Sequence, residues 1–568
     1  PKLVYSEPDM YATNFTDPEI ELIFDEYIQL NNINSELIVS PPVDEKPQVK
    51  LRNRSVLVDL KNELRDSVTY TINFGESIVD NNESNPISGF EFVFSTGSHI
   101  DSFAVAGKLV NSFTHEPYEK EVHVMLFDNL ADSAPSTVLP AFIGKTTEEG
   151  TFSINNVKSD TFRIFALQDA NSNLKYDLPN EHIAFFDTAV FLSPSLFQFS
   201  DTIIVDSTLI PELPTDTIQP VLDTLSSIEN TDIRKTYTLY TPLFMFEEEK
   251  DQQYLVEDNR EDKHRLRLVF NKPLDTIHFD ALNIDKDNWY LKEYSIEKDT
   301  LDLWLKDTVL VQNDSILLEV SHYGLDTAQN KVWVTDTLLF KTTQKKKTSR
   351  RGRKGEDESS KESIPDLLNL NIRSGSVIDL NSTIRIQGRY PITSVDTSGI
   401  RLHRIEDSVH IETPFQLMMD TLPGRKFHIT TEWKESTQYE IFIEPNTFKN
   451  LYHYPQDTVN MSFKTQSIDY YGTIIFDLKN VPHNIIIQFF TGDKIVRQQI
   501  VNADGSYAFN YMPPKEYQVK VIYDSNNNGE WDTGDYLKHM QPEQVDFFPE
   551  KISVRSNWEI EYDWDLKK

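Results

Sequence analysis

Short runs in which apolar and polar residues alternate dominate the chain. Four clear examples are residues 20–30 (IELIFDEYIQL), 55–60 (SVLVDL), 70–74 (YTINF) and 90–97 (FEFVFSTG). Each run is bounded by Asn, Asp, Pro or Gly, the residues that favour turns. Apolar positions spaced as in an amphipathic helix are rare. The pattern therefore predicts an all-β protein built from tandem antiparallel β-sandwiches.

Three stretches share one order of elements: residues 18–97, 264–343 and 382–466. Each opens with an alternating strand that meets a bend. Each later has a strand with Tyr or Leu facing inward, a polar turn and a closing strand that ends in Phe-x-Thr. An internal repeat of this kind indicates separately folded units. We therefore expect three related sandwiches, named A1, A2 and A3 in chain order.

A second repeat interleaves with the first. Its two copies start at Gly150 and Gly505, and each glycine precedes the first Asp of an Asp- and Asn-rich loop by 19 positions (Gly150 to Asp169, Gly505 to Asp524). Each copy also follows a strand that begins with glycine. Equal spacing and a matching strand pattern indicate two sandwiches of a second type, named B1 and B2. The order is then A1, B1, A2, A3, B2.

The expected boundaries are 1–98 (A1), 99–207 (B1), 208–263 (a linker or extension), 264–343 (A2), 344–363 (a flexible charged linker), 364–466 (A3) and 467–568 (B2). The segment 344–363 lacks apolar side chains altogether, which is typical of a solvated linker. Its basic half is the only positive block in an acidic chain. That half is either part of a self-avoiding linker or a docking arm for an acidic surface or lipid head groups.

Composition narrows the function classes. Lys plus Arg total 55 and Asp plus Glu total 90, so the formal charge is −35. A surface this acidic repels nucleic acid, because nucleic-acid binding depends on Lys and Arg at the phosphates. The chain has no Cys, which excludes disulfides, thiolate catalysis and cysteine zinc sites. No stretch approaches the roughly 18 apolar residues of a membrane helix.

The loop of B2 places oxygen-bearing side chains at positions 1, 3, 5, 9 and 12 of a twelve-residue loop. These residues are Asp524, Asn526, Asn528, Asp532 and Asp535. Gly529 stands at position 6, where a calcium loop turns sharply, and Glu530 at position 7 can offer its backbone carbonyl. Calcium prefers six to eight hard oxygens, so the spacing predicts a structural calcium site.

The loop of B1 keeps part of this pattern. Its candidate ligands are Asp169, Asn171, Asn173, the carbonyl of Lys175, and Asp177. Leu174 replaces the glycine at position 6, and Asn180 replaces the acid at position 12, where Glu181 can substitute through a shifted loop end. The alternative for both loops is a turn held by side-chain hydrogen bonds of Asp and Asn, without metal.

Catalytic motifs are absent from the sequence, and we expect no enzyme activity. The segment GKTT at 144–147 lacks the upstream glycine and the helix that a phosphate loop needs. Trp433, Trp531 and Trp558 could form a platform for sugars, although aromatic residues in sandwiches more often belong to the core.

The A repeats resemble the bacterial Ig-like domains of surface-layer proteins, through runs such as IELIFDEYI and FVFSTG. The B repeats resemble prealbumin-like, carboxypeptidase-regulatory sandwiches, through GKLVNSFTHEPYEKEVHVMLFD followed by FRIFALQDANSNLKYD. The first two modules together are similar to Ig-like-domain lipoproteins of the Bacteroidota outer membrane.

The resemblance implies a non-catalytic scaffold. Lipoproteins of this kind carry a lipidated Cys, here expected just before Pro1, and touch the membrane only through that anchor. They serve as accessory subunits of outer-membrane machinery for protein assembly, secretion or nutrient uptake. The expected partner is therefore an integral outer-membrane protein, on the extracytoplasmic side. The alternative is an adhesin-like surface module that binds a glycan or another ligand.

Overall fold

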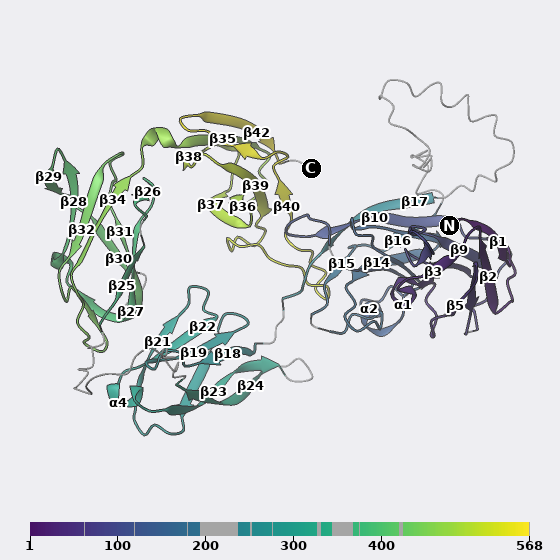
Figure 1. The fold of residues 1–568 in the computed structure, drawn as a ribbon, viewed down its shortest axis with the longest axis horizontal. Coiled ribbons are helices and arrows are strands. Elements are labelled where there is room, and N and C mark those ends of the chain that lie inside the picture. Colours follow the sequence, from purple (N-terminus) through teal and green to yellow (C-terminus); the bar gives the residue numbers. More distant parts are fainter. Residues whose placement is uncertain are drawn as a thin grey trace, which may run out of the picture. The chain divides into compact units, whose positions relative to one another are not determined.

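The computed structural model describes residues 1–193, 237–249, 253–325, 331–342, 367–419 and 424–566, except positions 62, 119, 179, 275 and 374 (Figure 1). The all-β prediction is confirmed, because strands dominate every described part. The chain forms two compact units. One contains Pro1–Glu249 and Val521–Asp546, and the other contains Lys250–Lys520 and Phe547–Lys568.

Module A1 lies in the first unit, in the purple part of Figure 1. Its four-stranded sheet has the order β1 (Leu3–Glu7), β2 (Glu19–Phe24), β6 (Ser55–Asp59), β5 (Gln48–Arg52). The other strands are β4 (Ile38–Ser40), β7 (Thr69–Asn73) and β9 (Glu91–Ser95) in one sheet and the pair β3 (Ile28–Leu30) and β8 (Ile78–Asp80), with the short helix α1 (Ile33–Glu36) between β3 and β4.

The alternating pattern explains how A1 forms its core. In β2, Ile20, Leu22 and Phe24 are buried, while Glu19 is exposed on the opposite face. Successive side chains of a strand point to opposite faces, so one alternating run supplies one core face and one solvated face. Each such apolar side chain contributes about 1.5–3 kcal/mol when fully buried.

Module B1 also lies in the first unit and has two sheets. The three-stranded sheet has the order β13 (Thr151–Val157), β10 (Phe103–Asn111), β17 (Tyr237–Met245). The second sheet has the order β12 (Phe142–Lys145), β11 (His123–Phe127), β14 (Thr161–Leu167), β15 (Ile183–Phe185), with β16 (Val190–Phe191) also paired to β14; the helix α2 (Ala134–Thr137) follows β11.

The described part of the expected linker or extension 208–263 forms strands. Strand β17 pairs in parallel with all nine residues of β10, and β18 (Leu255–Asn259) pairs with the first long strand of A2. Pro242 lies in β17, at the edge of its sheet. An edge strand tolerates proline, because the missing N–H need not serve a second neighbour. The part of the expected linker before residue 237 lies outside the described residues.

Modules A2 and A3 lie in the second unit. A2 has two sheets. The first has the order β18, β19 (Arg265–Phe270), β22 (Thr300–Leu305), β21 (Tyr290–Tyr294), and the second has the order β20 (Ile277–Ala281), β23 (Ser315–Leu325), β24 (Lys331–Lys341). The short helix α4 (Thr308–Val311) lies between β22 and β23 in sequence. A3 also has two sheets. The first has the order β25 (Leu370–Arg373), β27 (Ile384–Val395), β31 (Gly424–Thr430), β30 (Gln416–Met419), with β33 (Phe448–Asn450) paired to β27. The second has the order β26 (Val377–Ile378), β34 (Val459–Thr465), β32 (Gln438–Ile443), β28 (Ile400–Glu406), β29 (Val409–Glu412), and the 3-10 turn η4 (Thr397–Gly399) precedes β28. The expected linker 344–363 lies outside the described residues.

The strand orders repeat as the sequence repeats do. In every A module the four-stranded path runs first, second, fourth, third strand in chain order. B2 starts after the 3-10 turn η5 (Ile468–Tyr470) and has β38 (Gly505–Met512), β35 (Gly472–Lys479), β42 (Glu559–Asp565) in one sheet and β37 (Lys494–Val501), β36 (Ile485–Thr491), β39 (Glu516–Tyr523), β40 (Val545–Phe547) in the other, with β41 (Ile552–Ser553) paired to β39. These paths match those of B1, including the parallel edge strand.

Candidate functional site

Both Asp- and Asn-rich loops lie in the first unit and follow matching strands, β14 and β39. In each loop the first Asp accepts hydrogen bonds from two backbone N–H groups further along. Asp169 accepts from Asn173 and Leu174 at 3.2 and 2.7 Å. Asp524 accepts from Asn528 and Gly529 at 3.1 and 2.9 Å. In both loops the Asp at position 1 therefore accepts from the N–H groups at positions 5 and 6.

In the loop of B1 the Asn side chains use both ends of their amides. The side-chain oxygens of Asn171 and Asn173 accept from the N–H groups of Asn173 and Lys175. Their Nδ2 groups donate to the two carboxylate oxygens of Asp177 at 3.1 and 2.7 Å. The first, third, fifth and ninth positions therefore meet in one hydrogen-bonded ring.

The loop of B2 repeats this ring. The side-chain oxygens of Asn526 and Asn528 accept from the N–H groups of Asn528 and Glu530. Both Nδ2 groups donate to Oδ2 of Asp532 at 2.8 Å. Glu530 and Lys175 thus take part through their backbone N–H groups, whereas the spacing predicted a contribution from their carbonyl oxygens.

A buried glutamate closes each ring. Glu181 is 1% exposed and accepts from the N–H groups of Ala170, Asp177 and Leu178 at 3.2, 3.1 and 3.0 Å. Glu181 therefore lies at the end of the loop, and its role as a metal ligand stays a prediction. Asn180, at position 12, is exposed.

In the loop of B2, Glu543 takes the closing role that the spacing assigned to Asp535. Glu543 accepts from the N–H of Ser525 at 2.6 Å, from its Oγ at 2.7 Å and from the N–H of Asp532 at 3.3 Å. Asp535 instead accepts from the N–H of Lys538 and pairs with its Nζ at 2.7 Å. The expected ligand Asp535 is thus engaged outside the ring, because ten residues (533–542) separate Asp532 from the closing acid in B2, against three (178–180) in B1.

The missing turn glycine of B1 does not change the loop backbone. Leu174 has a φ of 58°, and Gly529 at the same loop position has a φ of 83°. The left-handed conformation disfavours a side chain by about 1–2 kcal/mol. Leu174 packs against the cluster of buried residues around Phe165 and Ile143, and this packing offsets the strain.

The side chains of each loop can be compared with the ligands that calcium prefers. Each ring contains three carboxylates and two Asn amides, whose oxygens are hard donors of the kind that calcium prefers. None of the six carboxylates has a cationic side-chain partner among the described residues. Before Asp177 or Asp532 could coordinate a calcium ion, the Asn Nδ2 groups that donate to it would have to turn away. Consistent with that requirement, no group of three or more His, Asp or Glu in the described chain is arranged to hold a metal as it stands.

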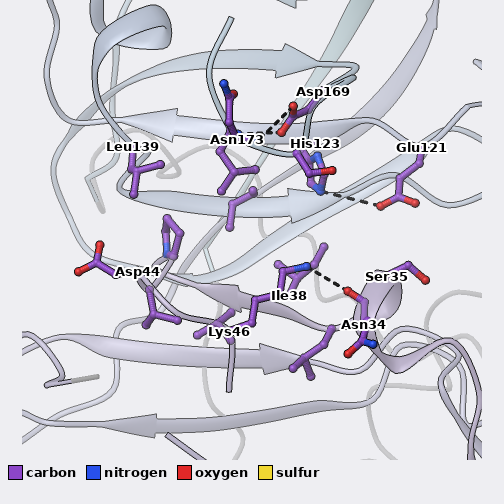
Figure 2. A pocket seen from close by; sticks show the side chains of 17 residues that line it. Asn34, Ser35, Ile38, Asp44, Lys46, Glu121, His123, Leu139, Asp169 and Asn173 are labelled. Atoms are coloured by element: carbon purple, nitrogen blue, oxygen red, sulfur yellow. Dashed lines mark hydrogen bonds and ion pairs between the residues drawn. The ribbon is translucent and has the colours of Figure 1, made fainter. Parts of the chain in front are cut away.

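A cavity of about 770 Å³ lies beside the first loop (Figure 2). Asp169 and Asn173 of that loop lie on one side, and Asp44 and Lys46 of A1 lie on the other. Leu37, Val39, Pro42, Val43, Leu139 and Leu174 supply apolar walls. The cavity is thus shared by A1 and B1 within the first unit.

His123 of β11 projects into this cavity (Figure 2). Its Nδ1 is buried without a hydrogen-bond partner in the described structure, and its Nε2 lies 3.9 Å from Glu121. Burial lowers the pKa of His123, so the imidazole is neutral near pH 7. The cavity therefore offers one uncharged imidazole among carboxylates and a lysine.

The three tryptophans that could form a sugar platform have different surroundings. Trp433 packs edge-on against Tyr439 and Phe463 and donates to a backbone carbonyl. Trp531 donates to the carbonyl of Glu543, and Trp558 is 53% exposed with a guanidinium over its ring. Another exposed aromatic pair lies in A2 instead.

Residues 1–96 match a family model described as bacterial Ig-like domain, which confirms the Ig-like prediction for A1. No curated protein gives a significant match. In the described part of the chain, no helix has the length and apolar character needed to span a bilayer.

Solved structures of several repetitive β proteins give distant matches. The N-terminal part of the bacterial S-layer protein SbsC is 15% identical over 38% of this chain and 44% of that one, with a TM-score of 0.17. The major pilin subunit of Bacillus cereus is 8% identical over 82% of this chain and 100% of that one, with a TM-score of 0.13. Alpha-2-macroglobulin domains of Escherichia coli are 10% identical over 52% and 96%, with a TM-score of 0.17. At these scores the likeness carries no argument about function.

Proposed function

We propose that this protein is a non-catalytic scaffold at the bacterial cell surface, an accessory subunit that holds a partner in a fixed geometry. The observation that carries the proposal is the buried, specific contact between neighbouring modules inside each unit. Modules on flexible linkers move independently unless their interface is well packed. A packed interface instead gives a rigid body suited to positioning other proteins.

In the first unit, A1 and B1 are joined by polar contacts at a closed junction. The N–H of Ile143 donates to Oγ of Ser40 at 3.0 Å, where both residues are buried. Asn156 donates to Oγ1 of Thr71 at 3.0 Å. Such directional bonds fix the rotation of one module against the other.

In the second unit, A2 and A3 share one apolar core. The fully buried His264 of A2 contacts the rings of Tyr390 and Tyr452 of A3 at 4.8 and 4.6 Å. Arg425 of A3 pairs with Glu293 of A2 at 2.8 Å. These two modules therefore form a second rigid body.

We further propose that the scaffold lies on the extracytoplasmic side of the outer membrane, where a lipid anchor holds it and it binds an integral outer-membrane protein. The resemblance of A1 and B1 to Bacteroidota lipoproteins supports this assignment. The acidic chain, with a net charge of −35, supports attachment through an anchor rather than through contact with anionic lipid.

Purification from native membranes tests the scaffold. The tagged full chain is extracted with a gentle detergent, and the co-purifying proteins are identified by mass spectrometry. An integral outer-membrane protein in fixed ratio to the chain is the expected result. Recovery only as a free monomer would overturn the proposal.

We also propose that each Asp- and Asn-rich loop holds a structural calcium ion. The ring of oxygens and the absence of a cationic partner for its carboxylates in the described chain support this role. The ion would stiffen a loop at the edge of a sandwich and supply no chemistry.

A second candidate function is binding of a neutral glycan to A2. Trp333 is 45% exposed on the outer face of β24 and stacks on Tyr323 at 4.1 Å, with the ring of His278 at 4.9 Å. The hydroxyl groups of Ser321 and Thr335 lie on the same face, 2.8 Å apart. A flat ring can pack against the C–H face of a sugar while the hydroxyls bind its polar edge.

Affinity electrophoresis in gels that contain neutral polysaccharides tests this second function. Trp333→Ala should abolish any retardation, whereas Trp558→Ala removes an equally exposed indole from B2 and serves as the control. Equal mobility of the two variants and the parent chain on every polysaccharide would refute a glycan site at Trp333.

A further inference from the structure

The ten residues between Asp532 and Glu543 form an extension that is seven residues longer than its counterpart in the loop of B1. In B1 only three residues separate the corresponding Asp177 and Glu181. The extension turns back on itself, because the backbones of Asp535 and Met540 exchange hydrogen bonds at 2.8 and 2.9 Å. It belongs to B2 in sequence but to the first unit in its contacts.

The extension buries one aromatic side chain in B1. Tyr536 is 3% exposed and meets the rings of Phe165 and Phe185 edge-on, each at 5.1 Å. Phe246 and Met125 belong to the same buried cluster. Its neighbour Leu537 is 75% exposed, so the burial is specific to Tyr536.

Polar contacts surround this aromatic anchor. The N–H of Tyr536 donates to Oε1 of Glu248 at 2.5 Å, and Oγ1 of Thr533 donates to the carbonyl of Glu247 at 2.7 Å. Gln541 donates to the carbonyl of Phe185 at 2.9 Å. A buried aromatic centre within a polar rim is the arrangement of a specific interface.

Gly534 allows this close approach. A Cβ built at Gly534 would lie 2.7 Å from two atoms of the Phe246 ring and 2.7 Å from the carbonyl oxygen of Met540. No side chain larger than hydrogen fits between the extension and B1. Gly534 of the extension and the ring of Phe246 in B1 are therefore complementary in shape.

Glu248 also links the docked extension to the first loop. Its Oε2 accepts a hydrogen bond from the hydroxyl of Tyr176, which lies between Lys175 and Asp177. One carboxylate therefore bridges the two Asp- and Asn-rich loops.

We propose that residues 533–541 are a clasp, and that the B1 surface formed by Phe165, Phe185, Phe246 and Glu248 is its receptor within the same molecule. The clasp joins B1 to a segment that follows it in sequence only after A2 and A3, and B1 and that segment both lie in the first unit. The proposal goes beyond the scaffold function and needs no partner protein. A distance measured within the isolated chain therefore tests it independently.

The absence of Cys from the chain makes this measurement direct. Cysteines introduced at the exposed Leu130 of B1 and Leu537 of the clasp carry nitroxide labels, and pulsed electron paramagnetic resonance measures their separation in the full chain. A single narrow distance distribution is expected. Tyr536→Ala should lower the ratio of closed to open molecules by on the order of 100-fold, because it removes a buried aromatic ring.

Two further variants keep the test decisive. Gly534→Val leaves Tyr536 in place but inserts atoms where none fit, and should broaden the distribution in the same way. Met540→Ala changes an exposed side chain of the same extension and should leave it narrow. Circular dichroism confirms that each variant keeps its β content.

The remaining outcomes overturn the proposal. A broad distribution in the parent chain would mean that no clasp forms. A distribution that stays narrow in both Tyr536→Ala and Gly534→Val would mean that other contacts hold the segment. A signal between molecules that carry one label each would make a second copy, not the same chain, the occupant of the receptor.

Discussion

The loop of B2 makes a prediction that separates the two candidates for its closing acid. Glu543→Gln keeps the size of the side chain but replaces one of its carboxylate oxygens by an N–H donor. Glu543 is 8% exposed, so water cannot readily replace the lost acceptor. The N–H groups of Ser525 and Asp532 are the donors affected.

The expected magnitude follows from these bonds. A hydrogen bond to a charged group contributes about 1.5–3 kcal/mol, and a buried donor left unpaired costs a similar amount. Glu543→Gln removes the charge and one acceptor oxygen but retains the other oxygen. We therefore expect local opening of the loop to become easier by about 2 kcal/mol, which corresponds to about 30-fold.

Backbone hydrogen exchange followed by mass spectrometry measures this opening. The amides of Ser525 and Asp532 should exchange about 30-fold faster in Glu543→Gln, because exchange reports local opening. The amide of Ala170 in B1, held by Glu181, provides an internal control that should not change. Faster exchange in Asp535→Asn, with none in Glu543→Gln, would show that the assignment of the closing acid is incorrect.

Four further predictions concern strain, buried charge and metal. Gly529→Ala should open the same loop more readily by about 1–2 kcal/mol, because its φ of 83° disfavours a side chain; the same exchange experiment measures this. Asp302→Asn should destabilise the second unit by roughly 2 kcal/mol, because it removes the buried carboxylate that pairs with the partly buried guanidinium groups of Arg265 and Arg267; urea unfolding followed by tryptophan fluorescence checks it. Lys520→Met should stabilise B2 by about 3 kcal/mol at pH 7, because burial lowers the pKa of Lys520 to about 8 from 10.5 and the folded state must hold the charge; the gain should disappear as the pH rises from 8 to above 10.5, in thermal unfolding at a series of pH values. Titration calorimetry of the parent chain with calcium should release or absorb heat that Asp524→Ala reduces, and equal heats would end the calcium proposal for B2.

The local part of the site could be predicted from the sequence. Positions 1, 3, 5 and 9 of both loops meet in a ring because they lie within nine consecutive residues of a tight loop. The spacing alone fixes which side chains can converge over such a short path. The left-handed backbone at Leu174 follows from the same argument, since its loop position matches that of Gly529.

The closing acid of B2 could not be predicted by counting, because the clasp separates it from Asp532. A signal was nevertheless present in the strands that follow. Residues 181–186 read EHIAFF and residues 543–548 read EQVDFF, which lead into the matching strands β15 and β40. Aligning these strands, rather than counting loop positions, places Glu543 opposite Glu181.

Two features depend on partners far along the chain, and no local pattern reveals such partners. Strand β17 contains Pro242, which weakens its strand signal, and it forms only because β10 offers a free edge. Tyr536 lies in a polar run that is typical of a turn, and its burial is decided by Phe165 and Phe185 of B1.

The position of the clasp has a consequence for synthesis of the chain. Translation proceeds from the N-terminus at about 5–20 residues per second, and early domains fold first. B1 has all its strands once Met245 has emerged, but its receptor for Tyr536 must wait for roughly 290 more residues, or about 15–60 s at that rate. During this interval an aromatic surface is open to solvent and to other chains. A holding chaperone, or early contact between nascent chains, would act at this surface before residues 533–541 cover it.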